Sequence, residues 1–194
     1  MQMEDHDDHD GRKVWLTERE ASEFIATASD TQQRIAFGLG LRCGLRCKEI
    51  VEVTPQDVTD GPAGTFLRVQ NGKGDKYRET PLPGDLATTI STLADLREAD
   101  DATPLVDVST RTVERWVGSA GEQLAEQKED DGWTYLTPHD LRRTWGTLLC
   151  EREVEPGLVM EYGGWEDWDT FRKHYLGQYS VKAQQRAREK VPWL

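Results

Sequence analysis

The stretch that most constrains the fold of this chain reads Thr-Pro-His-Asp-Leu-Arg-Arg-Thr over residues 137–144. Thr137 is a favourable N-cap and Pro138 suits the first helical position, so the stretch predicts the beginning of a helix. Such a helix places His139 and Arg142 on one face of its first turn. An imidazole beside a guanidinium suits a phosphate, because the arginine holds two oxygens while the histidine donates a hydrogen bond or moves a proton. An ordinary pair of surface side chains is the alternative.

Length and composition favour one domain without a membrane span. A chain of 194 residues can bury a substantial core, and no run of about 18 apolar residues occurs in it. The first residues are acidic rather than basic and then apolar, which is unlike a signal peptide. Cys43, Cys47 and Cys150 are odd in number and lack metal-motif spacing. We therefore expect reduced, buried thiols in a cytoplasmic protein rather than a zinc site.

The charge balance bears on the partners of the chain. Its net charge is −12 and its pI is near 4.8, and a protein of this charge is repelled by nucleic acid at low ionic strength. In molar salt, however, the Debye length falls to about 3 Å, so a global negative charge hardly opposes DNA binding beyond contact range. Abundant Asp and Glu with fewer Lys and Arg are typical of proteins from a salt-rich cytoplasm. We interpret the composition as halophilic.

The chain begins with a charged segment and continues with predicted helices. We expect a disordered acidic tail over residues 1–13. Order is predicted to begin at residues 14–16, and the capping-box pattern Thr17-x-x-Glu20 then opens a helix to about residue 28. Further helices are predicted over residues 31–43, 84–96, 110–126, 138–152, 156–163, 170–175 and 181–190.

Two shorter motifs lie between these helices. Gly44 ends one helix, Arg46 lies at the break and Glu49 follows one turn on, where it can orient the arginine; an exposed ion pair at a helix end is the alternative. Residues 65–82 predict a β-hairpin, because two alternating segments flank an Asn-Gly-Lys-Gly-Asp turn. Lys73 at its tip is either a solvated loop lysine or a mobile carrier of a charge and a proton. The predicted fold class is mainly α with a small antiparallel β-sheet.

In this order, the motifs resemble the catalytic domain of the tyrosine recombinases, the phage-integrase family that includes the Xer-type enzymes. The similarity covers residues 14–180. The matching segments are Gly-Leu-Arg46-x-x-Glu49, Gly72-Lys73-Gly74-x-Lys76-x-Arg78, His139-x-Leu141-Arg142, Gly163-Gly164-Trp165 and Tyr175. The chain is thus similar to an Xer-like recombinase, with a halophilic archaeon as the expected source.

The resemblance implies the tyrosine recombinase catalytic-domain fold and an enzyme that breaks and rejoins double-stranded DNA without a metal ion or other cofactor. In such enzymes a tyrosine hydroxyl attacks a phosphodiester, which forms a 3′-phosphotyrosyl link and releases a 5′-hydroxyl. Arginines neutralise the transition-state charge in place of magnesium. By resemblance the nucleophile is Tyr175, and Arg46 and Arg142 bind the phosphate. His139 and Lys73 transfer protons, Trp165 packs against or hydrogen-bonds the phosphate, and Glu49 supports the pocket. The residues that contact DNA are Lys76, Arg78 and Arg143.

Several alternatives remain open. The interval between Trp165 and Tyr175 is one residue longer than is usual in the family, so Tyr179 and, less readily, Tyr162 are alternative nucleophiles. The basic segment 181–194 either docks on its own domain or is exchanged between protomers of a homo-oligomer on DNA. For the whole chain, the alternatives are a catalytically inactive or accessory DNA-binding relative without the family's N-terminal clamp domain, a type IB topoisomerase, and a helical domain whose motif matches arise by chance.

Overall fold

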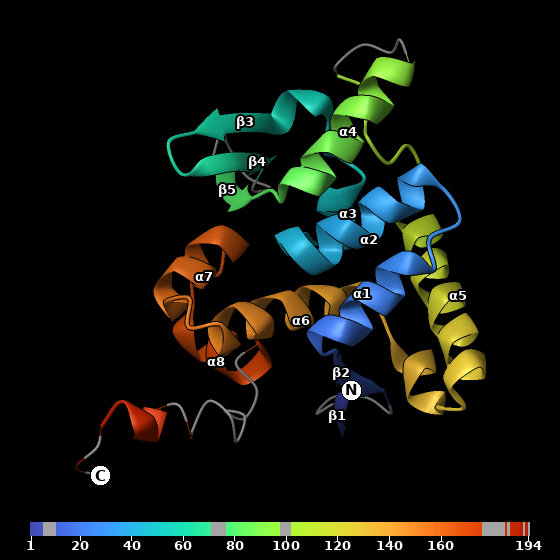
Figure 1. The fold of residues 1–194 in the computed structure, drawn as a ribbon. Coiled ribbons are helices and arrows are strands. Elements are labelled where there is room, and N and C mark those ends of the chain that lie inside the picture. Colours follow the sequence, from blue (N-terminus) through green and yellow to red (C-terminus); the bar gives the residue numbers. More distant parts are fainter. Residues whose placement is uncertain are drawn as a thin grey trace.

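The computed structural model describes residues 1–5, 11–70, 77–97, 102–175, 185, 187–191 and 193, and for residues 173–175 the backbone alone. Within this part of the chain most residues are helical, and two small antiparallel sheets complete the fold (Figure 1). Helices α2 (Thr31–Cys43) and α6 (Pro138–Glu151) pack against each other at the centre, and α5 (Thr110–Lys128) lies along one side. The predicted fold class is confirmed.

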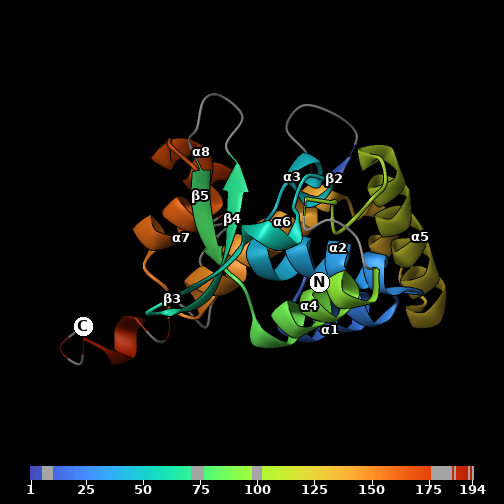
Figure 2. The same cartoon turned by 90° about the horizontal axis from the view of Figure 1, so that it is seen from above.

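The larger sheet positions one part of the site. It consists of β3 (Val58–Gly61), β4 (Gly64–Gln70) and β5 (Tyr77–Pro81) in that order, and both pairs of neighbours are antiparallel. The hairpin of β4 and β5 agrees with the prediction for residues 65–82, whereas β3 is an additional strand with a single apolar residue. In both views β5 lies beside α7 (Pro156–Gly163), which packs against it (Figure 2).

The amino-terminal segment differs from the predicted disordered tail over residues 1–13 where it is described, at residues 1–5 and 11–13. Its first part forms β1 (Gln2–Asp5), which pairs antiparallel with β2 (Arg12–Trp15). The side chain of Met3 packs against a buried apolar cluster beneath this pair. A charged segment stays disordered when no other segment pairs with it. Here β2 supplies backbone hydrogen bonds, and the apolar cluster supplies a packing surface for Met3.

Strand β2 is itself held by the central helix α6. The amide of Val14 donates to Asp140 Oδ1 at 3.0 Å, and the amide of Leu16 donates to Thr144 Oγ1 at 3.0 Å. Val14 is fully buried and Leu16 nearly so. Residues 14–16 are therefore fixed to the helix that carries much of the site, although order begins before them, at β1.

Helix α2 supplies core on all its sides. Its bounds are those predicted, and every residue from 35 to 41 is buried. A Cβ at Gly38 would lie 3.1 Å from Leu86, and a Cβ at Gly40 would lie 3.2 Å from Leu141, so both glycines permit close packing. Because α2 is enclosed in this way, its C-terminal end is held in place, and so is the beginning of the turn at Gly44 that follows it.

The remaining elements are α1 (Glu18–Ala26), α3 (Cys47–Ile50), the 3-10 turns η1 (Pro55–Asp57) and η2 (Asp131–Tyr135), α4 (Gly84–Arg97) and α8 (Trp168–Tyr175). Helices α1, α4 and α8 follow the predicted order with shifted ends; the helix predicted from residue 170, for example, begins at Trp168. Most of the helix predicted over 181–190 lies outside the described residues. None of the described helices combines the length and apolar character needed to cross a membrane.

Candidate active site

The site begins at the sharp turn that follows α2. The turn residue Gly44 has a left-handed backbone with φ of 68°, and a Cβ there would lie 2.2 Å from the ring of Trp145. Only glycine combines this backbone with so close an approach. The turn places Arg46 at the N-cap of α3, with 43% of its side chain exposed. Arg46 is therefore accessible, and the chain that carries it is fixed.

The carboxylate of Glu49 organises the same segment. It accepts the amide of Arg46 at 2.7 Å and a guanidinium N–H of Arg46 at 2.8 Å, so the predicted contact between these two residues is present. A second arginine, Arg78 of β5, donates to both carboxylate oxygens at 2.8 Å. Burial raises the pKa of Glu49, but the hydrogen bonds and charge of Arg78 and Arg46 lower it by more, so the pKa lies below its ordinary value.

The second predicted clamp arginine, Arg142 of α6, is fully buried. Its guanidinium donates to the carbonyl oxygen of Gly44 and, at 2.6 Å, to that of Gly163. These carbonyls belong to the turn before Arg46 and to the last turn of α7. Carbonyls at a helix C-terminus carry partial negative charge, so they orient a guanidinium without neutralising it. Arg142 thus joins two distant segments and keeps its charge.

The ring of Trp165 completes the surroundings of Arg142. The guanidinium carbon of Arg142 lies 4.2 Å from the centre of the ring, which is a cation–π contact. A Cβ on Gly163 would lie 2.0 Å from the same ring, so the end of α7 needs glycine there. Trp145 and Phe171 pack around Trp165, with ring centroids 5.8 and 4.9 Å away. Trp165 therefore buttresses the arginine that is predicted to bind phosphate.

His139 and Arg142 share the first turn of α6, but their surroundings differ. His139 is exposed, whereas Arg142 is buried. The start of the helix is held by Asp140, whose Oδ2 accepts the amide and the hydroxyl of Thr137 at 2.9 and 2.6 Å. The imidazole thus lies on the accessible side of a turn whose backbone is fixed.

Arg78 and Arg143 are both buried against carboxylates. The exposed fraction of the side chain is 4% for Arg78 and 3% for Arg143. Arg143 pairs with Asp140 and lies over the ring of Trp15, 5.3 Å from its centre, and Arg78 pairs with Glu49. Each satisfies a buried carboxylate, which would be costly to bury alone. The contact of both residues with DNA stays a prediction.

The structure describes the other predicted residues only in part. Lys73, Lys76, Tyr179 and the side chain of Tyr175 lie outside the described residues. The backbone of Tyr175 ends α8, which is anchored by the fully buried Phe171. Tyr162, the less favoured alternative nucleophile, is partly buried, with its ring centroid 6.3 Å from that of Phe66.

Some contributors to the site have weak sequence signals. The carbonyls of Gly44 and Gly163 have none, because every residue carries a carbonyl. Asp140 has a partial one: the pattern Thr137-x-x-Asp140 is a capping-box spacing and predicts the helix start. That pattern does not reveal the buried ion pair of Asp140 with Arg143 or its bond to β2.

The cysteines do not belong to the site. All three are free; Cys43 is buried as expected, whereas Cys47 and Cys150 are only partly buried. Burial raises the pKa of Cys43 to about 12 and the pKa values of Cys47 and Cys150 to about 11, so the thiols stay protonated and are poor nucleophiles. Across the described ranges, no group of three or more His, Cys, Asp or Glu side chains is arranged to hold a metal ion.

Solved structures share this fold. A crystal structure of XerA recombinase superimposes with a TM-score of 0.73 at 24% identity, over 91% of this chain and 64% of that one. XerH site-specific recombinase bound to palindromic difH substrate gives a TM-score of 0.68 at 18% identity, over 92% of this chain and 52% of that one. The fold is therefore the catalytic-domain fold of the tyrosine recombinases.

Sequence comparisons then define the family. Residues 14–180 match the phage integrase family, and the chain belongs to it. A tyrosine recombinase of Thermosipho africanus is 30% identical over 172 residues, which are 82% of this chain and 56% of that protein. Tyrosine recombinase XerA of Pyrococcus furiosus is 28% identical over 153 residues, which are 77% of this chain and 52% of that protein. The chain thus spans about half the length of the curated relatives it matches.

Proposed function

We propose that the protein cleaves and rejoins DNA strands as a site-specific recombinase, through a 3′-phosphotyrosyl intermediate. The observation that carries the proposal is the junction of the two arginine segments, where Arg142 donates to the carbonyl of Gly44, just before Arg46. Two guanidiniums on joined segments suit the oxygens of one phosphate. Membership of the phage integrase family supports the same assignment.

The proposed reaction assigns one step to each side chain. The hydroxyl of Tyr175 attacks the scissile phosphorus, and the bond to the 5′-oxygen breaks. His139 assists removal of the tyrosine proton, and Lys73 gives a proton to the leaving oxygen. Arg46 and Arg142 neutralise the charge on the non-bridging oxygens. The phosphotyrosyl bond conserves the energy of the phosphodiester, so a 5′-hydroxyl can rejoin the strand without a nucleotide or a metal ion.

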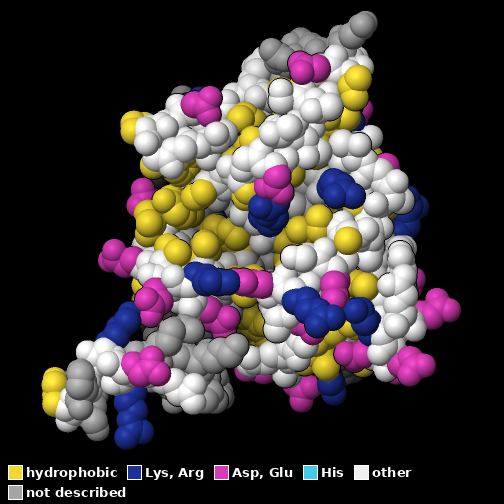
Figure 3. All heavy atoms as spheres, viewed as in Figure 1, with side chains coloured by type: hydrophobic (Ala, Val, Ile, Leu, Met, Phe, Trp, Pro, Cys, Tyr) yellow, Lys and Arg dark blue, Asp and Glu magenta, His cyan; other side chains and the backbone are white. Residues whose placement is uncertain are grey.

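Double-stranded DNA is the proposed partner. Among the structural neighbours, XerH was solved with its difH substrate and the Tn1549 integrase with transposon right end DNA. On the face shown in Figure 3, Lys and Arg side chains are interspersed with Asp and Glu rather than gathered in one basic patch. With a net charge of −12, this surface favours binding where salt screens the repulsion. We therefore propose a salt-rich cytoplasm as the working environment.

The first prediction tests the reaction itself. Nicked duplexes with randomised sequence around the nick are incubated with the protein in molar salt and EDTA. A covalent protein–DNA band is expected on a denaturing gel, because arginines rather than a divalent ion stabilise the transition state. Loss of the band with chelator and its return with magnesium would place the protein in another class of nuclease. DNA binding without any band would favour the accessory DNA-binding alternative.

The second prediction concerns assembly. We propose that residues 181–194 help protomers to assemble on DNA, because the segment is basic and the 82% exposed side chain of Trp193 offers apolar surface to a partner. Deleting residues 181–194 is expected to spare cleavage of a single strand while lowering the number of protomers bound to each duplex. Native mass spectrometry of the DNA complex measures that number. Unfolding of the truncated protein, or unchanged assembly, would contradict the proposal.

A further inference from the structure

Arg78 is a buried arginine that the proposed reaction does not use. Only 4% of its side chain is exposed. Its two terminal nitrogens donate to the two oxygens of Glu49 at 2.8 Å each, and its Nε donates to the carbonyl of Tyr162 at 2.9 Å. Glu49 lies 29 residues away in the sequence and Tyr162 lies 84 residues away. One side chain therefore joins β5 to α3 and α7.

The neighbouring strand β4 carries an arginine, Arg68, that is partly exposed rather than buried. Arg68 of β4 has 40% of its side chain exposed. It pairs with Glu79 at 3.8 Å and lies over the ring of Tyr77, 4.8 Å from its centre, so these contacts stay within the hairpin. Arg68 is thus a matched control for Arg78, because it has the same chemistry on the same sheet and lines a pocket with Glu49, but its ion pair is with Glu79 rather than with Glu49.

The geometry at Glu49 shows how Arg78 can act at a distance. A two-point bond from a guanidinium fixes the plane of a carboxylate. One oxygen of that carboxylate is shared, since it accepts from both Arg78 and Arg46 at 2.8 Å. The bond to the Tyr162 carbonyl in turn fixes Arg78, because the C-terminus of α7 carries partial negative charge. The position of the Arg46 guanidinium therefore depends on a chain of contacts that begins at α7.

We propose that Arg78 is a positioning residue that acts through Glu49 to hold the guanidinium of Arg46 in the orientation that binds the scissile phosphate. Arg78 itself touches no reacting atom. The inference rests on the proposed function, because the orientation of Arg46 matters to catalysis only if Arg46 contacts that phosphate.

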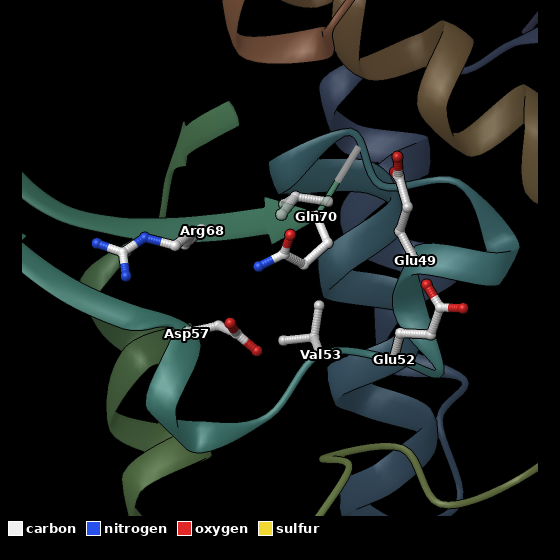
Figure 4. A pocket seen from close by; sticks show the side chains of 7 residues that line it. Glu49, Glu52, Val53, Asp57, Arg68 and Gln70 are labelled. Carbon is white, nitrogen blue, oxygen red and sulfur yellow. The ribbon is translucent and has the colours of Figure 1, made fainter. Parts of the chain in front are cut away.

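The burial of Glu49 makes Arg78 more important. A small open pocket is lined by Glu49, Glu52, Val53, Asp57, Arg68, Val69 and Gln70. Figure 4 shows Glu49 and Glu52 on the α3 side, with Asp57 and Gln70 across the pocket. Burial favours the protonated carboxyl, while Arg78 and Arg46 hold the pKa of Glu49 below its ordinary value. Without Arg78, the pKa of Glu49 is expected to rise.

The experiment compares Arg78→Ala and Arg78→Lys with Arg68→Ala in the full chain. DNA affinity and the single-turnover rate of adduct formation on nicked DNA are measured separately. Both Arg78 variants are expected to be slower by on the order of 10–100-fold, as is typical when a group that orients a ligand-binding residue is lost. Their DNA affinities should stay within about threefold of the wild type, since no phosphate contact is removed. Arg68→Ala should match the wild type in both measurements.

Three results would overturn the inference. A loss mainly in DNA affinity would make Arg78 a DNA contact. Full recovery of the rate in Arg78→Lys would mean that charge alone suffices, because lysine cannot form the two-point bond. A full multiplicative loss when Arg78→Ala is added to Arg46→Ala would show that Arg78 does not act through Arg46, since residues that act as a unit are non-additive. The expected additional loss is less than about threefold.

The pH–rate profile separates positioning from a merely structural role. In Arg78→Lys, the acidic limb of the pH–rate profile should move to higher pH, because the pKa of Glu49 rises; an unmoved limb would count against the inference. Arg78→Lys also replaces Arg78→Ala if the alanine variant does not fold.

The same experiment tests the recombinase function separately from the positioning role of Arg78. If neither the wild type nor Arg68→Ala forms an adduct, the recombinase function fails regardless of Arg78. The Nη1–H signal of Arg46, the guanidinium group that donates to Glu49 Oε1, then tests the positioning by nuclear magnetic resonance without catalysis. Faster hydrogen exchange at this group in Arg78→Lys than in Arg68→Ala supports the inference, and equal exchange overturns it.

Discussion

Tyr175→Phe is expected to form no covalent adduct with nicked DNA, while its DNA affinity and unfolding temperature stay close to those of the wild type. The phosphotyrosyl bond needs the hydroxyl oxygen, and phenylalanine lacks only that atom. Helix α8, which ends at Tyr175, is anchored by Phe171, whose ring packs 4.9 Å from that of Trp165. The helix should therefore stay in place. A denaturing gel measures the adduct, and a binding titration measures the affinity.

The matched controls are Tyr179→Phe and Tyr162→Phe, which remove the hydroxyl of each competing tyrosine. Both are expected to form the adduct at the wild-type rate. The contact of Tyr162 with Arg78 uses its backbone carbonyl, which phenylalanine retains. An adduct that persists in Tyr175→Phe and disappears in Tyr179→Phe would show that the nucleophile has been assigned to the wrong tyrosine.

Arg142→Ala is expected to slow adduct formation by on the order of 10²-fold or more, because a preorganised donor to the transition-state charge is lost. The same change should also destabilise the fold. It leaves the carbonyls of Gly44 and Gly163 without this donor, and each uncompensated buried group costs about 1–3 kcal/mol. Single-turnover rates measure the first effect, and urea unfolding measures the second.

Two other arginines separate these effects. Arg46→Ala is expected to lose a similar factor in rate with little change in stability, because 43% of that side chain is exposed. Arg143→Ala should do the reverse: it strands the buried carboxylate of Asp140, a change that costs about 3–5 kcal/mol, while the rate per folded molecule changes much less. Equal losses of rate in Arg46→Ala, Arg142→Ala and Arg143→Ala would mean that the phosphate clamp has been assigned to the wrong guanidiniums.

Signals within a few residues predicted most of the helices. Helices α2 and α7 have the predicted bounds, and each is followed by a glycine with a left-handed backbone, Gly44 and Gly164. The first turn of α6 follows from Thr137 at the N-cap and Pro138 at the first helical position. These features depend on the backbone nearby, so the local sequence contains the information that determines them.

The differences from the predictions occur where segments distant in the sequence meet. A disordered tail was the natural expectation for a charged amino terminus, but β1 pairs with β2, which α6 holds through Asp140. A hairpin motif does not indicate burial of its arginine, but Arg78 is buried against Glu49. Neither partner can be recognised from the neighbouring residues.

The sequence by itself determined the residue types of the site and the elements that carry them, from Arg46 beside its turn to Tyr175 at the end of α8. Only the tertiary structure decided which of the charged side chains are accessible. Arg142 meets the carbonyl of Gly44 across 98 residues, and Arg78 meets Glu49 across 29. The physical reason is that helix starts and turns follow from local backbone preferences, whereas a buried charge is stable only when another segment supplies its partner.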